Sequence, residues 1–185
     1  EQKRHCPARR PGAGAPGERL MLAPGTHSGG IVITKRLTIE GEGGAIVDAG
    51  GTGTAVIIQT SNVTVRGLTI RGSGTRGEAF DSGVYIEQGA DHVTGADNRL
   101  ERNLFGIVLH GSKFATVRRN HIANRSDLWP NDRGNGIHIW NNTGALIDGN
   151  TVTSGRDGIY IEISHGNVIR ANRFEGLRFA VHYMY

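Results

Sequence analysis

The stretch GRDGIYIEIS, residues 155–164, places an apolar residue at every second position after a glycine. Alternation with a period of two is typical of a half-buried β-strand. The same order of glycine, apolar, variable and apolar residue recurs in FGIVLHGS at 105–112 and in GNGIHIWNN at 134–142. Because one short strand occurs several times, the chain is predicted to be built from repeats.

Two series of residues define the length of the repeat. The small residues that open each strand lie 23, 30, 22 and 22 positions apart, at Gly83, Gly106, Gly136, Gly158 and Ala180. A second series, in which an asparagine begins each short run, has spacings of 22, 30 and 22, at Asn98, Asn120, Asn150 and Asn172. Both series therefore indicate a 22-residue unit with an 8-residue insertion between Asn120 and Gly136.

The repeat continues upstream in a weaker form. VRGLTI at 65–70 matches IRANRF at 169–174, which places Leu68 in the asparagine position and a second 8-residue insertion between Ile70 and Gly83. RLTIEG at 36–41 is one further copy of the same motif. The sequence thus predicts about six coils.

A 22-residue unit of short alternating runs, stacked on its own copies, indicates an all-β fold, the right-handed parallel β-helix. We expect this domain to span residues 20–185, with isoleucine and valine filling the bore and the four asparagines stacked as a structural ladder. Residues 1–19 contain no apolar run and are expected to be a disordered or truncated leader. The last strand has no polar cap, so we expect an N-terminal fragment of a longer helix.

Composition excludes several classes of function. The net charge of +4 comes mainly from four basic residues in the first ten, so the domain itself is nearly balanced and a nucleic-acid partner is not expected. The single cysteine, Cys6, cannot form an internal disulfide. No stretch approaches the ~18 apolar residues of a membrane span, so direct membrane insertion is not expected.

The variable positions of the repeated strand are predicted to form one outward-facing wall. This wall collects aromatic, imidazole, carboxylate and thioether groups: Tyr85, Glu87, Val108, His110, His138, Trp140, Tyr160, Glu162, His182 and Met184. Both insertions, 71–82 and 124–135, should emerge beside it and add Trp129 and Asp132 to a binding surface. The alternative interpretation is that the rings are good strand formers that cover a sheet.

Two chemistries suit such a wall. Imidazole and thioether groups favour copper, bound transiently, and the candidate ligands are His182 and Met184, with His138 and His110 further along the face. Alternatively, Tyr160 and Trp140 would stack on sugars while outward acids serve a polysaccharide lyase or epimerase: Asp81, Asp132, Asp157 and Glu162. No pair of carboxylates repeats across adjacent coils, and Asp157 in GRDG fits a turn former.

GNGIHIWNN, DLWPNDRG and the run that ends in FAVHYMY resemble the NosD family, and so do the upstream APGTHSGGIVITKRLTIEGEGG and VTVRGLTIRGSG. The resemblance covers roughly residues 20–185. It implies a non-enzymatic periplasmic β-helix protein that helps assemble the copper sites of nitrous-oxide reductase. Its implied partners are a membrane ABC transporter, a copper-donor lipoprotein and the reductase. The runner-up function is a carbohydrate-binding or polysaccharide-modifying β-helix protein.

Overall fold

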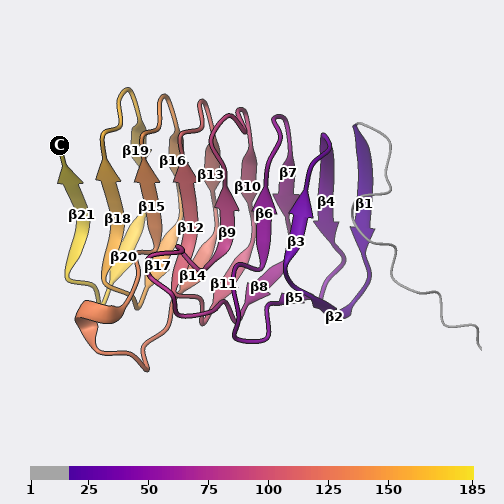
Figure 1. The fold of residues 1–185 in the computed structure, drawn as a ribbon, viewed down its shortest axis with the longest axis horizontal. Helices are drawn as coiled ribbons and strands as arrows, with labels where there is room; N and C mark the ends of the chain where they lie inside the picture. The colour runs from indigo at the N-terminus through magenta and orange to yellow at the C-terminus, as the bar shows by residue number, and fades with distance from the viewer. Residues whose placement is uncertain (1–16) are drawn as a thin grey trace, which may run out of the picture.

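A computed structural model describes residues 17–185, and these form a right-handed parallel β-helix with three faces (Figure 1). The first sheet contains β1 (Glu18–Leu22), β4 (Leu37–Gly41), β7 (Thr64–Arg66), β10 (Thr94–Ala96), β13 (Thr116–Arg118), β16 (Leu146–Asp148) and β19 (Val168–Arg170). The second contains β2 (Gly25–Ser28), β5 (Ala45–Asp48), β8 (Thr69–Arg71), β11 (Arg99–Glu101), β14 (His121–Ala123), β17 (Thr151–Thr153) and β20 (Arg173–Glu175).

The third sheet is made of the repeated strand that occurs in FGIVLHGS, GNGIHIWNN and GRDGIYIEIS. Its members are β3 (Ile31–Ile33), β6 (Val56–Ile58), β9 (Ser82–Ile86), β12 (Phe105–His110), β15 (Ile137–Trp140), β18 (Asp157–Glu162) and β21 (Phe179–Met184). Every pairing is parallel, and Ile107 lies beside Ile137, which lies beside Ile159. The 22-residue repeat and the two insertions are therefore confirmed.

Two sequence predictions need correction. Each sheet has seven strands, so the described residues make seven coils and not about six, because β1, β2 and β3 add a first coil whose sequence departs from the repeat. The segment RLTIEG at 36–41 was matched to VRGLTI through the shared LTI, but it forms β4 of the first sheet, whereas LTI at 68–70 leads into β8 of the second sheet. Ile39 pairs with Val65 of β7, whereas Ile70 of β8 pairs with Val47. The expected leader lies, up to residue 16, outside the described residues, as does Cys6.

The core is a column of isoleucine, valine and leucine in the bore. The side chains of Ile33, Ile58, Ile86, Leu109 and Ile139 follow one another along the third sheet, and each is nearly or fully inaccessible to solvent. One coil alone could not bury these residues, so burial depends on stacking of neighbouring coils.

The glycines near the start of β12, β15 and β18 are required by close approach of the next coil. A Cβ on Gly106 would lie 2.4 Å from the carbonyl oxygen of Gly136, and a Cβ on Gly136 would lie 2.7 Å from that of Gly158. On Gly158 it would lie 2.5 Å from the carbonyl oxygen of Ala180. Side chains cannot occupy these positions without displacing backbone, which explains the series of small residues.

The asparagine series occupies the corner between the first and second sheets. The Nδ2 group of Asn98 donates to Oδ1 of Asn120 at 3.1 Å, Asn120 donates to Asn150 at 3.0 Å, and Asn150 donates to Asn172 at 2.9 Å. Each Nδ2 also donates to a carbonyl of the preceding coil, such as that of Gly95 for Asn120. The side chains thus satisfy backbone groups that the turn leaves unpaired.

Candidate functional site

The outer face of the third sheet carries two adjacent columns of side chains. Strand pairing aligns the first column across successive coils as Tyr85, Val108, His138, Tyr160 and His182. The second column runs in the same way through His110, Trp140, Glu162 and Met184. The aligned wall that the sequence predicted is present, although its members differ in exposure.

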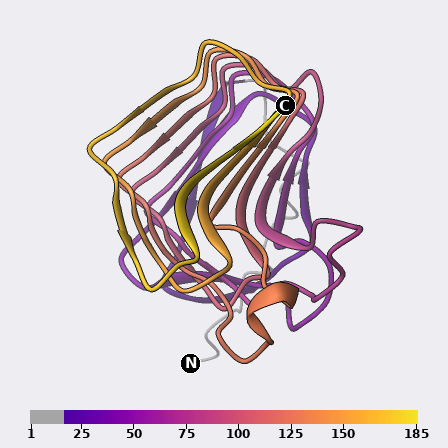
Figure 2. The same ribbon diagram turned by 90° about the vertical axis from the view of Figure 1, so that its left-hand side faces the viewer.

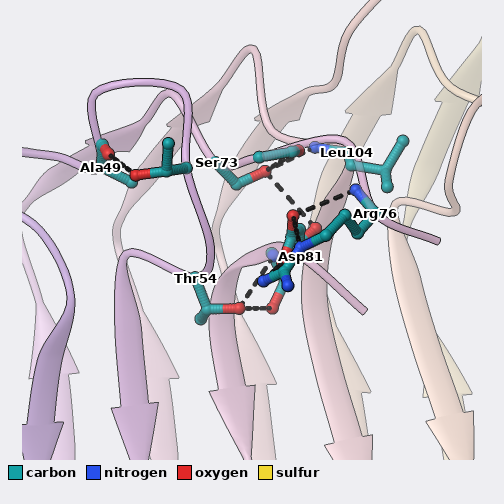
Figure 3. Close-up of polar contacts among 9 residues, drawn as sticks. Ala49, Thr54, Ser73, Arg76, Asp81 and Leu104 are labelled. Carbon is teal, nitrogen blue, oxygen red and sulfur yellow. Dashed lines mark hydrogen bonds and ion pairs between the residues drawn. The ribbon is translucent and has the colours of Figure 1, made fainter. Parts of the chain in front are cut away.

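A loop between β8 and β9 is anchored against this wall by a buried aspartate (Figure 3). Asp81 is 2% exposed, and its Oδ2 atom accepts a hydrogen bond from the backbone nitrogen of Arg76 at 3.0 Å while its Oδ1 accepts one from Nη2 of Arg76 at 3.3 Å. The Oγ atom of Ser73 accepts a hydrogen bond from the backbone nitrogen of Leu104 at 2.8 Å. These bonds fix the loop, and with it Phe80.

The second loop joins β14 to β15 and includes the short 3₁₀ turn η1 (Pro130–Asp132). Arg133 holds this loop by donating from Nε to the carbonyl of Leu128 and from Nη2 to that of Ser126, both at 2.8 Å. Figure 2 shows both loops projecting from the same side of the prism. The prediction that the two insertions emerge beside the wall is confirmed, since both connect the second sheet to the third.

The loops cover part of the wall that the sequence predicted to face solvent. Val108 is fully buried, and His138 is 7% exposed. Phe80 from the first loop lies 5.1 Å from the His138 ring, and Phe105 lies 5.6 Å from it, both at steep angles. The expected exposure of Val108 and His138 is therefore wrong, because Phe80 from the first insertion and Phe105 from the start of β12 pack over this part of the wall.

Beyond these rings the wall opens into a groove of about 400 Å³. Side chains from four coils and both loops line it: Phe80, Phe105, Arg133, Asn135, His138, Trp140, Arg156, Tyr160, Glu162, His182 and Met184. Oδ1 of Asn135 and Nε of Arg156 are buried there without a hydrogen-bond partner. The combination of apolar rings and a few unpaired polar atoms is typical of a ligand site.

Each of the three histidines of the wall is held through Nδ1 by a different group. His110 Nδ1 lies 2.7 Å from the hydroxyl of Tyr85. His138 Nδ1 lies 3.1 Å from the amide nitrogen of Asn135, and His182 Nδ1 lies 3.0 Å from Oδ2 of Asp157. All three rings are thus oriented by the protein at one nitrogen, as metal-binding histidines generally are.

The electrostatics differ from one end of the groove to the other. Burial, with the nearby His110, lowers the pKa of His138 to about 4, so that ring is neutral at physiological pH. Burial and the neighbouring Glu162 raise the pKa of Tyr160. Burial tends to raise the pKa of the Asp157 carboxyl, but hydrogen bonds from Arg178 and His182 outweigh it and hold the pKa below its usual range.

Asp157 was predicted from the sequence only as one of four candidate acids of the carbohydrate alternative, and it was interpreted as a turn former. In the structure its carboxylate is fully buried and accepts two hydrogen bonds from Arg178, at 2.9 and 2.7 Å. Phe80, Phe105 and Asn135 were missed as site residues. The sequence held one signal for Asn135 and Asp157: in both, a polar residue lies two positions before the first apolar residue of the repeated strand.

The proposed copper ligands do not form one compact site. Within residues 17–185 no three histidine, cysteine or acidic side chains lie close enough together to hold a metal ion. Tyr160 lies between His138 and His182, with its ring 4.9 Å from the first and 5.0 Å from the second. His182 and Met184 share one face of β21, and both line the groove.

The remaining binding-surface residues lie around the groove. His110 stacks on Trp140 with ring centroids 4.3 Å apart, and Glu87 accepts a hydrogen bond from Gln59. Trp129 is 81% exposed on the second loop, and Asp132 is also exposed there. Neither of these two lines the groove.

Comparison with known proteins identifies relatives of the fold and of the sequence. A family model described as a right-handed β-helix region matches residues 25–138 and 53–185. The chain is 36% identical over 140 residues to a probable ABC transporter binding protein NosD of Pseudomonas aeruginosa, covering 76% of this chain and 33% of that protein. Identity to the protein of the same description from Stutzerimonas stutzeri is 34%, covering 76% and 32%.

These relatives are longer than the chain, whose matching segment spans about a third of each. Among solved structures, a putative glycosyl hydrolase from Parabacteroides merdae superposes with a TM-score of 0.59 at 17% identity, covering 89% of this chain and 81% of that one. At this identity the likeness concerns the fold alone. On the family match and the observed architecture, the chain belongs to the right-handed β-helix family.

Proposed function

We propose that this chain is part of a periplasmic accessory protein that acts by binding during assembly of the copper sites of nitrous-oxide reductase. The similarity to NosD proteins described as ABC transporter binding proteins supports a transporter-associated role. Its partners in this proposal are a membrane ABC transporter, a copper-donor lipoprotein and the reductase. Within residues 17–185 no helix is long and apolar enough to cross a membrane.

The observation that carries the proposal is the pair His182 and Met184 at the groove. Strand β21 presents an imidazole and a thioether on the same face, and the register places them beside Tyr160 and Glu162. Soft ligands of this kind suit Cu(I), and a site with only two of them would release the ion more readily than a closed four-ligand site. Such a site fits transfer of copper as cargo, with no catalytic turnover by the chain itself.

The test is a Cu(I) titration against a competing chelator. We expect His182→Ala combined with Met184→Ala to lower the Cu(I) affinity of the protein at least tenfold. The matched control is His121→Ala combined with Met21→Ala, which removes the same two residue types from strands on other faces. Equal affinity in the parent and the groove variant would remove His182 and Met184 from any copper role.

Carbohydrate binding is a second candidate, favoured by the unpartnered polar atoms between aromatic rings. Arg156 and Asn135 both line the groove, and Nε of Arg156 and Oδ1 of Asn135 are buried without a hydrogen-bond partner. A uronate would offer a carboxylate to Arg156, hydroxyl groups to Asn135 and a ring face to Trp140. Incubation with uronate polymers tests this directly, and binding or unsaturated products would favour it over the copper role.

A further inference from the structure

The partners of the three wall histidines differ in what they allow at Nδ1. The hydroxyl of Tyr85 can donate to His110 or accept from it, and the amide of Asn135 can present either its nitrogen or its oxygen to His138. Asp157 is different because an ionised carboxylate only accepts hydrogen bonds. Among the three wall histidines, therefore, only His182 has at Nδ1 a partner that favours a proton on that nitrogen.

The surroundings of Asp157 strengthen this conclusion. Arg178 donates from Nε to Oδ1 at 2.9 Å and from Nη2 to Oδ2 at 2.7 Å, so the fully buried carboxylate is neutralised in a bidentate ion pair. Nδ1 of His182 lies 3.0 Å from the same Oδ2 and 3.2 Å from Nη2 of Arg178. The guanidinium can only donate, so it competes for a lone pair at Nδ1, but Nη2 already donates to Oδ2 at 2.7 Å and the contact with the carboxylate is the shorter of the two. A bare lone pair at 3.0 Å from a carboxylate oxygen would be repelled, whereas an Nδ1–H group donates to it.

We propose that Asp157 is a positioning residue that holds His182 as the Nδ1–H tautomer, so that the Nε2 lone pair points into the groove as a ligand atom. His182 and Met184 line the groove, and Nε2 of His182, unlike Nδ1, has no hydrogen-bond partner among the described residues. Arg178 positions Asp157 in turn. The identity of the bound ion rests on the proposed copper role, but the orientation of His182 does not.

This arrangement has a chemical consequence for the groove. A carboxylate behind a metal-binding histidine fixes the ring, raises the basicity of its free nitrogen and is worth about ten- to a hundredfold in metal affinity. His138 and His110 lack such a carboxylate. His182 is therefore the one histidine of the wall whose ring is oriented by a carboxylate for binding a soft cation through Nε2. Met184 supplies the neighbouring sulfur on the same strand face.

The first measurement needs no variant. The ¹⁵N chemical shifts of the histidine side chains distinguish the two neutral tautomers, and we expect His182 in the full chain, above pH 7.5, to be predominantly protonated at Nδ1. Asp157→Asn should convert it to a mixture or to the Nε2–H form. An Nε2–H tautomer in the parent protein, or an unchanged tautomer in Asp157→Asn, would overturn the proposal.

Two further variants separate positioning from folding. Arg178→Gln removes the arginine but keeps the carboxylate, so His182 should remain Nδ1–H. Asp97→Asn removes another carboxylate that forms a bidentate pair with an arginine but has no bonded histidine and lies outside the groove, and it should leave His182 unchanged. A change of tautomer in Asp97→Asn would show a general structural effect and overturn the specific role of Asp157.

Cu(I) affinity then gives the second readout. We expect Asp157→Asn to weaken Cu(I) binding about ten- to a hundredfold and Asp97→Asn to leave it unchanged. Unchanged affinity in an Asp157→Asn protein whose tautomer has shifted would refute the link between positioning and ligation. If no variant, nor the parent, binds Cu(I), the proposed copper role fails while the tautomer measurement still decides the role of Asp157.

Discussion

Two stacks of side chains run along this β-helix, the asparagine ladder and the third-sheet wall, and they differ in how regularly their contacts repeat. In the asparagine ladder the same bonds recur. Asn98, Asn120 and Asn150 each donate from Nδ2 to Oδ1 of the next asparagine and to a backbone carbonyl of the preceding coil. In the third-sheet wall each coil places a different residue in the same position, and Nδ1 of each histidine has a different partner. Identical stacking stabilises the solenoid, whereas varied stacking leaves atoms available to a ligand.

The largest effect is expected in the ladder. Asn120→Ala removes two donated bonds, to Gly95 and Asn150, and leaves the backbone nitrogen of Asn98 without its acceptor in a buried corner. Each buried group left unpaired costs about 1–3 kcal/mol, so we expect the free energy of unfolding to fall by about 4 kcal/mol. Urea denaturation measures this. The half-buried Asn172→Ala should cost less, and an equal loss would contradict the cooperative ladder.

Lowering the pH should destabilise the wall through His138. Its pKa is about 4 in the folded protein and 6.5 as the ordinary value, so below pH 6.5 the unfolded chain binds a proton that the folded chain does not. Stability is thus lost as pH falls from 6.5 toward 4, by about 3 kcal/mol at most. Urea denaturation at pH 7 and pH 4 compares the parent with His138→Gln, which should lack this component. The same pH dependence in both would contradict a buried neutral His138.

A smaller effect is expected for the stacked indole of the second column. Trp140→Ala removes ring contacts with His110 at 4.3 Å and with Phe80 at 6.0 Å, and it uncovers part of the groove. For a half-buried ring we expect a loss of about 2 kcal/mol in the free energy of unfolding, with Cu(I) affinity unchanged within twofold. A large drop in affinity without a change in stability would place Trp140 among the direct ligand contacts.

The smallest effect is expected at the loop surface. Trp129 is 81% exposed, so Trp129→Ala should change the free energy of unfolding by no more than about 0.5 kcal/mol. Thermal and urea denaturation give the value, and Trp140→Ala is the matched comparison. A loss as large as that of Trp140→Ala would mean that the loop depends on the indole for its conformation.

The fold was predictable from sequence because equivalent residues of neighbouring coils touch one another. The glycines near the start of β9, β12, β15 and β18 face the next coil's backbone, and each asparagine of the ladder bonds its own counterpart, so both recur at the repeat length. The number of coils was underestimated because the first coil has no ladder asparagine and its strand-opening Gly30 lies 25 residues before the equivalent Ala55 (55 − 30), not 22. RLTIEG was matched to the wrong strand because its LTI is identical to residues 68–70, which lead into β8. In the structure Ile39 pairs with Val65 of β7, and Ile70 of β8 pairs with Val47 of β5.

The site was only partly predictable because it depends on residues outside the repeat. The wall and its two columns followed from alternation, but the cover over His138 comes from Phe80 on an insertion whose path no period describes. The bond between Asp157 and His182 joins neighbouring coils in a diagonal direction, since strand pairing places Asp157 beside Phe179. The strand register alone therefore does not predict this contact, and it does not predict the ion pair between Arg178 and Asp157.

The most direct test of the central claim, that the third-sheet wall is the binding face, uses the two methionines of the chain. Met184 lies at the groove and is 44% exposed, while Met21 lies on β1 of the first sheet and is 42% exposed, so the two are matched in accessibility. With ¹³C-methyl methionine the protein gives two signals that can be followed by NMR during a Cu(I) titration. We predict that the Met184 signal shifts at stoichiometric Cu(I) while the Met21 signal stays in place; equal shifts of both signals, or no shift of Met184, would show that the wall is not the binding face.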